Sequence, residues 1–201
     1  MKKKCCTISL LWLLTLGLAA APARAETPTA YVRGILDKVM AIQTDPALAG
    51  EAHKQERARL IRQVIKQSFD FPLMAQDSLG PAYGRLSAAQ RQEFTDTFSY
   101  LFQDSYTRLV LNFLKQETIH YQRERLADSR AQVGTSLART NETIPVDYLL
   151  HRQGRGWILY DVIVDGVSIL EHYRREFTRV IRTHSFDYLM GKMRAQRRST
   201  E

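Results

Sequence analysis

The chain has 201 residues, of which 44% are hydrophobic and 25% are charged. This composition is typical of one globular domain or two small ones, and it excludes a disordered chain and a collagen-like repeat. The formal net charge of +8 at pH 7 would favour anionic partners, but part of that charge belongs to the N-terminal segment.

The first 25 residues have the pattern of a secretory signal peptide. Three lysines follow Met1, an apolar run covers residues 8–21, and Ala23-Arg24-Ala25 forms a small-x-small cleavage site. We therefore expect cleavage after residue 25 and one exported domain of residues 26–201. No later apolar run approaches the roughly 20 residues that a membrane-spanning helix needs, so the mature chain is expected to be soluble.

Removal of this segment changes both the charge and the cysteine content. The mature chain keeps 25 lysines and arginines against 21 acidic residues, a net charge of +4. Cys5 and Cys6 both leave with the segment, and both precede the apolar run, whereas a lipidated cysteine would follow it. The mature chain therefore cannot form disulfides, and its core alone must stabilise it.

Four helices are expected in the first part of the mature chain. Thr27-Pro28 is a helix start signal, and Ser87 with Gln90 forms a capping box before the strongest helical pattern in the sequence. Apolar residues at steps of three and four then define each helix. The helices are expected at residues 28–43, about 45–69, 72–79 and 87–115.

The second part of the chain predicts a sheet followed by more helices. β-branched and alternating stretches predict strands at residues 118–123, 131–139, 144–150 and 157–164, and the short turns between them imply an antiparallel meander. Helical spacing returns at residues 168–181 and 185–193, and the polar tail at 194–201 is expected to fray. Helices, sheet and helices in this order predict a single α+β domain.

Motifs for catalysis or for nucleic-acid binding are missing from the sequence. It has no G-x-S-x-G, no glycine-rich phosphate loop, no H-E-x-x-H and no mature cysteine. The five histidines are never paired on one helix face, so we expect no metal and no cofactor. Asp147 and Asp161 could form an acid–base pair in a pocket, which leaves a periplasmic hydrolase as an alternative, although hydrogen-bonding roles are favoured for them.

One helix and two strands supply the candidate lining of an apolar pocket. The helical stripe and the alternating strands place apolar side chains on facing surfaces. Such a pair of surfaces either fills the space between them or leaves a cavity, and the periodicity is compatible with both. The candidate lining residues are Phe94, Phe98, Leu101, Phe102, Tyr106, Leu109 and Phe113 on the helix and Val146, Tyr148, Ile158, Tyr160, Val162 and Val164 on the strands.

Two segments of the sequence resemble the motif blocks of one family. The first begins at Phe69-Asp70-Phe71-Pro72 and continues through Gly80 to the aromatic stripe, and the second is the run from Trp157 to Ser168 followed by Tyr173-Arg174 and Phe177. Both are similar to blocks of the MlaC family, also called the toluene-tolerance family. Tyr83 stands where the family often has Trp, and His172 stands where Asn is common.

The resemblance implies a fold and a function for the chain. It implies an antiparallel sheet packed with helices around a lipid pocket. It also implies a monomeric, non-enzymatic phospholipid carrier of the periplasm, which moves lipid between an outer-membrane lipoprotein complex and the substrate-binding subunit of an inner-membrane ABC transporter and so maintains outer-membrane lipid asymmetry. One branch of the family is associated with hopanoid transport, so a carrier of hopanoid or another lipid is an alternative. A binding module with a filled core is a third.

Overall fold

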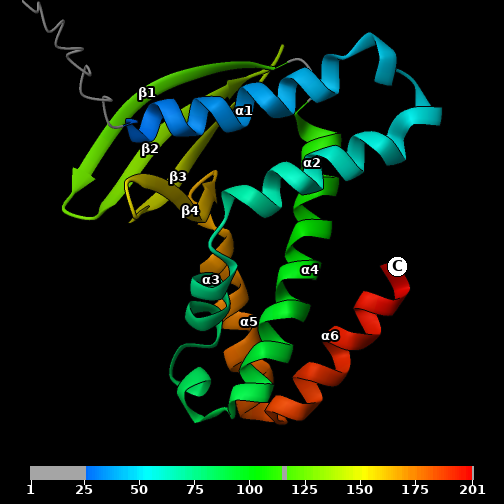
Figure 1. Cartoon of the computed structure of the whole chain (residues 1–201), viewed down its shortest axis with the longest axis vertical. Helices are drawn as coiled ribbons and strands as arrows, with labels where there is room; N and C mark the ends of the chain where they lie inside the picture. The colour runs from blue at the N-terminus through cyan, green and yellow to red at the C-terminus, as the bar shows by residue number, and fades with distance from the viewer. Residues whose placement is uncertain (1–25, 115–116, 201) are drawn as a thin grey trace, which may run out of the picture.

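The computed structural model describes residues 26–114 and 117–200, which form a single α+β domain, as the sequence predicts. The predicted signal peptide, residues 1–25, lies outside the described residues. Within the described residues, no helix has both the length and the apolar character needed to cross a membrane. Helices α1 and α2 lie beside the sheet, while α3, α4, α5 and α6 extend away from it as a helical layer (Figure 1).

The first helix and the longest helix begin where the sequence places their caps. The Thr27 hydroxyl accepts a hydrogen bond from the Ala30 amide before α1, and Ser87 with Gln90 forms a complete capping box before α4. Each cap satisfies backbone donors that the first turn of a helix leaves without partners. The helices are α1 (Pro28–Thr44), α2 (Lys54–Ser68), α3 (Phe71–Leu79), α4 (Ala88–Phe113), α5 (Ile169–Thr183) and α6 (Phe186–Thr200).

Two helix boundaries differ from the prediction. Residues 45–53 form two short 3-10 turns, Pro46–Leu48 and Glu51–His53, instead of the first turns of one long helix. Gly50 between them has a φ of 83°, which ends the helical conformation. The tail predicted to fray is also helical, because α6 continues to Thr200 and buries Met193 against the rest of the domain.

The sheet has five antiparallel strands in sequential order, not the four predicted. They are β1 (Thr118–Ala127), β2 (Arg130–Ala138), β3 (Thr143–Gln153), β4 (Gly156–Val164) and β5 (Val167–Ser168). The additional strand β5 has only two residues, and it pairs Val167 with Val164 across a turn at Asp165 and Gly166. Sequence periodicity cannot reveal so short a strand.

A bulge in β4 reverses the side-chain alternation that the sequence predicts. Leu149 pairs with Asp161 but Leu150 pairs with Leu159, so Tyr160 has no partner in β3. Because the bulge adds one residue to β4, the side chains before it point to the face opposite to the one that strict alternation predicts. Leu159 is therefore buried on the inner face, while Ile158 and Tyr160 lie on the other face.

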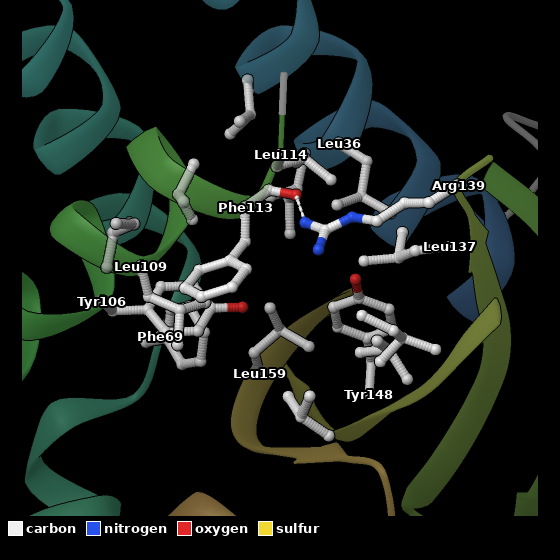
Figure 2. Close-up of a pocket in the computed structure, with 17 residues that line it drawn as sticks. Leu36, Phe69, Tyr106, Leu109, Phe113, Leu114, Leu137, Arg139, Tyr148 and Leu159 are labelled. Atoms are coloured by element: carbon white, nitrogen blue, oxygen red, sulfur yellow. Dashed lines mark hydrogen bonds between the residues drawn. The ribbon is translucent and has the colours of Figure 1, made fainter. Parts of the chain in front are cut away.

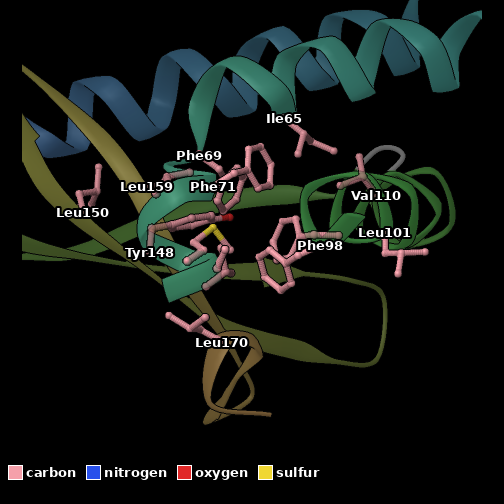
Figure 3. Close-up of a cluster of buried hydrophobic side chains, with 14 of the residues drawn as sticks. Ile65, Phe69, Phe71, Phe98, Leu101, Val110, Tyr148, Leu150, Leu159 and Leu170 are labelled. Atoms are coloured by element: carbon pink, nitrogen blue, oxygen red, sulfur yellow. The ribbon is translucent and has the colours of Figure 1, made fainter. Parts of the chain in front are cut away.

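The core joins the sheet to the helical layer. Phe94, Phe98 and Phe102 on α4 are almost fully buried, and aromatic rings from α3 and α5 surround them. Figure 3 shows Phe69, Phe71 and Phe98 between the sheet and α4, with Tyr148 and Leu159 on the sheet side. The centroids of the Phe98 and Phe102 rings are 6.1 Å apart, in the range that aromatic pairs prefer.

Candidate functional site: an apolar cavity

A cavity of about 220 Å³ lies between α1, the C-terminal half of α4 and the inner face of the sheet (Figure 2). It is larger than the dry cavity of roughly 150 Å³ that holds benzene in an engineered protein. All but one of its lining residues are aliphatic or aromatic. They are Ile35, Leu36, Val39, Ile65, Phe69, Tyr106, Leu109, Val110, Phe113, Leu114, Leu137, Ile144, Val146, Tyr148, Leu159 and Val164, together with Arg139.

The mouth of the cavity combines exposed apolar side chains with one arginine. Leu109 and Phe113 on the last turns of α4 are 40% and 50% exposed, and both also line the cavity. The Arg139 guanidinium lies 5.3 Å from the centroid of the Phe113 ring. A wider polar groove that includes Gln43, Arg57 and Arg139 continues from this point.

Two polar side chains make hydrogen bonds to the backbone at the C-terminal end of α4, beside the mouth of the cavity. Arg139, which directly follows β2, donates to the Phe113 carbonyl at 2.6 Å and to Glu117 at 3.1 Å. Gln43 on α1 donates to the carbonyls of Val110 and Leu114 at 3.2 and 2.8 Å. The Phe113 and Leu114 carbonyls lie at the end of the helix, beyond the last intrahelical donors, while the Val110 carbonyl also accepts from the Leu114 amide at 2.9 Å. The same contacts therefore cap α4 and hold α1 and β2 beside it.

The structure brings six of the thirteen candidate lining residues to the cavity. Tyr106, Leu109 and Phe113 contribute from α4, and Val146, Tyr148 and Val164 contribute from the sheet. Pairing of Val146 with Val164 and of Tyr148 with Val162 explains why the strand residues share one face. The predicted juxtaposition of one helix and two strands is therefore present at this end of α4.

The four candidates Phe94, Phe98, Leu101 and Phe102 lie elsewhere. Helix α4 has 26 residues and is about 39 Å long at 1.5 Å per residue, so one apolar stripe meets different partners at its two ends. The Phe94 ring lies 5.7 Å from the ring of Phe177 on α5. These four side chains are therefore packed in the helical core, and none of them lines the cavity.

The three candidates Ile158, Tyr160 and Val162 are also outside the cavity lining. Ile158 and Tyr160 are displaced by the bulge, and Leu159 occupies the inward position between them. The Tyr160 ring instead lies 5.2 Å from the Arg130 guanidinium. Val162 faces inward but is 1% exposed, because the core covers it.

Sequence reasoning missed the contribution of α1 and of the segment before α3. Ile35 and Val39 belong to the apolar stripe that predicts α1, and Leu36 widens it, but the stripe carries no information on which surface it faces. Phe69 reaches the cavity because its backbone runs beside β4, where the Asp70 amide donates to the Leu159 carbonyl at 2.8 Å.

The two carboxylates considered for hydrolysis have structural partners away from the cavity. Arg123 donates twice to Asp147, at 2.9 and 3.0 Å. Asp161 accepts from the Leu170 amide at 3.0 Å and from the Ser168 hydroxyl, and so holds the start of α5. Burial raises the pKa of Asp161, while these hydrogen bonds oppose the shift. Among the described residues, no three acidic, histidine or cysteine side chains are grouped to hold a metal.

The cavity and the positive charge are in different parts of the molecule. Residues 169–200, which include α5 and α6, contain eight arginines and lysines against three acidic residues, whereas residues 26–168 contain 17 of each. No residue of α5 or α6 lines the cavity. An apolar ligand would therefore bind in the part of the chain that has no net charge.

The fold and the cavity define a helix-and-sheet domain that can enclose an apolar ligand. The sequence model of the family described as "MlaC protein" matches residues 33–195. This chain belongs to the MlaC family.

Two relatives match this chain over almost their whole lengths. The chain is 26% identical over 198 residues to the intermembrane phospholipid transport system binding protein MlaC of Haemophilus influenzae, covering 95% of this chain and 92% of that protein. A phospholipid-binding protein from Ralstonia solanacearum, solved in complex with a phospholipid, is 26% identical with a TM-score of 0.71. That alignment covers 86% of this chain and 98% of the Ralstonia chain.

Proposed function

We propose that this protein is a phospholipid carrier that encloses the lipid tails in the cavity. The apolar lining of the cavity is the observation that carries this proposal. Each tail methylene that leaves water for an apolar environment contributes about 0.8 kcal/mol, so a carrier must cover nearly all of both tails. The phospholipid complex of the Ralstonia protein, which has a similar fold, supports the same ligand class.

The headgroup would remain at the mouth of the cavity. Burying a phosphate without partners is prohibitively costly, whereas the mouth offers water and the guanidinium of Arg139. The cavity volume of about 220 Å³ is below the roughly 300–1,000 Å³ of pockets for drug-sized ligands. A phospholipid is larger than such ligands, so its entry requires the walls formed by α1, α4 and the sheet to move apart.

We propose that the carrier works in the periplasm after cleavage following residue 25. The name of the Haemophilus relative describes an intermembrane phospholipid transport system, which supports partners in both membranes. These partners would be an outer-membrane lipoprotein complex and the substrate-binding subunit of an inner-membrane ABC transporter, and the transport would maintain lipid asymmetry. The basic helices α5 and α6 would suit an acidic partner surface, and that contact should weaken as salt concentration rises.

Lipid extraction from the purified protein tests the proposal directly. The full chain is expressed with export to the periplasm, its intact mass shows whether it begins at Glu26, and organic extracts are analysed by mass spectrometry. We expect a diacyl phospholipid in amounts close to one per protein. A hopanoid in the extract would support the alternative ligand, and an extract without lipid would overturn the carrier proposal.

A cavity-filling variant provides the matched test of the site. Val146→Phe adds bulk inside the cavity, whereas Leu126→Phe makes a similar change on a side chain that is 61% exposed. We expect reduced lipid retention for Val146→Phe only, with both variants folded by circular dichroism. Equal lipid retention by the two variants would contradict the assignment of the cavity as the binding site.

A further inference from the structure

The cavity contains a hydrogen-bond donor that the apolar tails of a lipid cannot use. Tyr106 on α4 lines the cavity, and its ring packs between Phe69 and Phe102 at centroid distances of 5.6 Å to each. Figure 2 shows its hydroxyl directed into the space between α4 and the sheet. Within the part of the chain that the structure describes, no hydrogen bond from this hydroxyl to the protein is found.

Tyr148 on β3 faces Tyr106 across the cavity but is in a different situation. Its hydroxyl also points inward (Figure 2), and it lies close to the Thr135 hydroxyl, which donates to the Val146 carbonyl at 3.1 Å. Thr135 is therefore a polar neighbour of Tyr148 within the protein. The carboxylate of Asp161 acts on Tyr106 electrostatically, but among the described residues no side chain makes a hydrogen bond with the Tyr106 hydroxyl, and a donor without a partner in an apolar site is costly.

We infer that the Tyr106 hydroxyl donates a hydrogen bond to an ester carbonyl of the bound lipid and so selects acyl over alkyl phospholipids. This inference rests on the proposed function. Both a phospholipid and a fully hydrocarbon ligand would satisfy the apolar walls, but only the former brings an acceptor into the cavity. Tyr106 is thus assigned as a specificity-determining residue in a lining whose other side chains, apart from Tyr148 and Arg139, are apolar.

The position of Tyr106 agrees with the depth at which ester groups would lie. It precedes the exposed Leu109 by three residues and the exposed Phe113 by seven, which is about 4.5 and 10 Å along the helix axis. Ester carbonyls join the tails to the headgroup, so a headgroup at the mouth places them just inside it. Burial raises the pKa of Tyr106, as does the carboxylate of Asp161, and the hydroxyl therefore keeps its proton at physiological pH.

Competition between ester and ether lipids tests the inference. Delipidated full-length mature protein is incubated with vesicles that contain diacyl and dialkyl phosphatidylcholine in equal amounts, with the same chain length. We expect the ester lipid to be enriched roughly fivefold in the bound fraction, as one hydrogen bond of about 1 kcal/mol would give. Tyr106→Phe should reduce this enrichment to about one.

Tyr148→Phe is the matched control, because it removes the same atom from the facing wall. It should keep the ester preference of the unaltered protein. An unaltered protein that binds both lipids equally, or a Tyr106→Phe variant that keeps the preference, would overturn the inference while leaving the carrier function intact. Equal loss of preference in both variants would overturn the assignment to Tyr106 alone. Failure of the unaltered protein to bind either lipid would instead count against the carrier proposal.

Discussion

Removal of the bound ligand should lower the melting temperature of this protein by roughly 10–20 °C. An empty cavity in a protein core costs about 24 cal/mol per Å³. For a volume of about 220 Å³ this is about 5 kcal/mol. In a domain of 150–250 residues, each kcal/mol shifts the melting temperature by about 2–4 °C. Partial collapse of the walls around the empty space would bring the shift toward the lower end of this range.

The assay compares three preparations of the same mature chain. The first is the protein as purified, the second has been delipidated under conditions that keep it folded, and the third has been reloaded from phospholipid vesicles. Mass spectrometry establishes the lipid content of each, and far-ultraviolet circular dichroism follows unfolding. The third preparation is the control for damage during delipidation.

Two results would refute the reasoning. One is a delipidated protein that melts within about 3 °C of the loaded one, because the cavity would then contribute little to the stability of the loaded state. The other is a low melting temperature that reloading does not restore, since the change would then report damage rather than an emptied cavity.

Three further expectations concern single positions or groups. Arg139→Ala removes the donor to the Phe113 carbonyl, so bound lipid should pass faster to acceptor vesicles, and an unchanged transfer rate would contradict a role for Arg139 at the mouth. Gly134→Ala should destabilise the fold by about 1–3 kcal/mol without affecting lipid retention, because its Cβ would lie 2.8 Å from atoms of both Arg123 and Asp147; denaturant unfolding measures this. Burial raises the pKa of both cavity tyrosines, so their contribution to stability is complete below their ordinary pKa of about 10 and is lost as the pH rises above it. Ultraviolet difference spectra should show that these two tyrosines, together with the largely buried Tyr173, ionise at higher pH than the exposed ones.

The sequence predicts the elements of this fold well because their signals are local. Caps such as Ser87 with Gln90 and the turn at Asp165 and Gly166 act within a few residues, and the structure contains both. The bulge at Tyr160 depends instead on how β4 pairs with β3. No pattern within a single strand reveals such a bulge. The sequence therefore predicts Ile158 and Tyr160 on the inner face of β4, where the structure places Leu159.

The cavity lining was only partly predictable for a related reason. An apolar stripe indicates that a face is buried, but it does not indicate what covers the face. On α4 the same stripe continues from Phe94 to Phe113, and only the tertiary arrangement divides it between core and cavity. The contribution of α1 was missed because Ile35 and Val39 form an ordinary amphipathic pattern that any buried helix would show.

This division of α4 allows a carrier to exist in both loaded and empty states. The N-terminal half of the helix packs its phenylalanines against Tyr173 and Phe177 of α5, and those contacts do not involve the ligand. The C-terminal half borders the cavity, where emptying costs about 5 kcal/mol by the volume argument. Domains of this size have a total stability of about 5–15 kcal/mol, so a loss of that size is tolerable only if the rest of the core is independent of the ligand. The contacts of Phe98 with α5 meet that requirement, whereas Phe102 also contacts the cavity residues Phe69 and Tyr106. The longest apolar stripe in the sequence is therefore divided between core packing and the lining of the cavity.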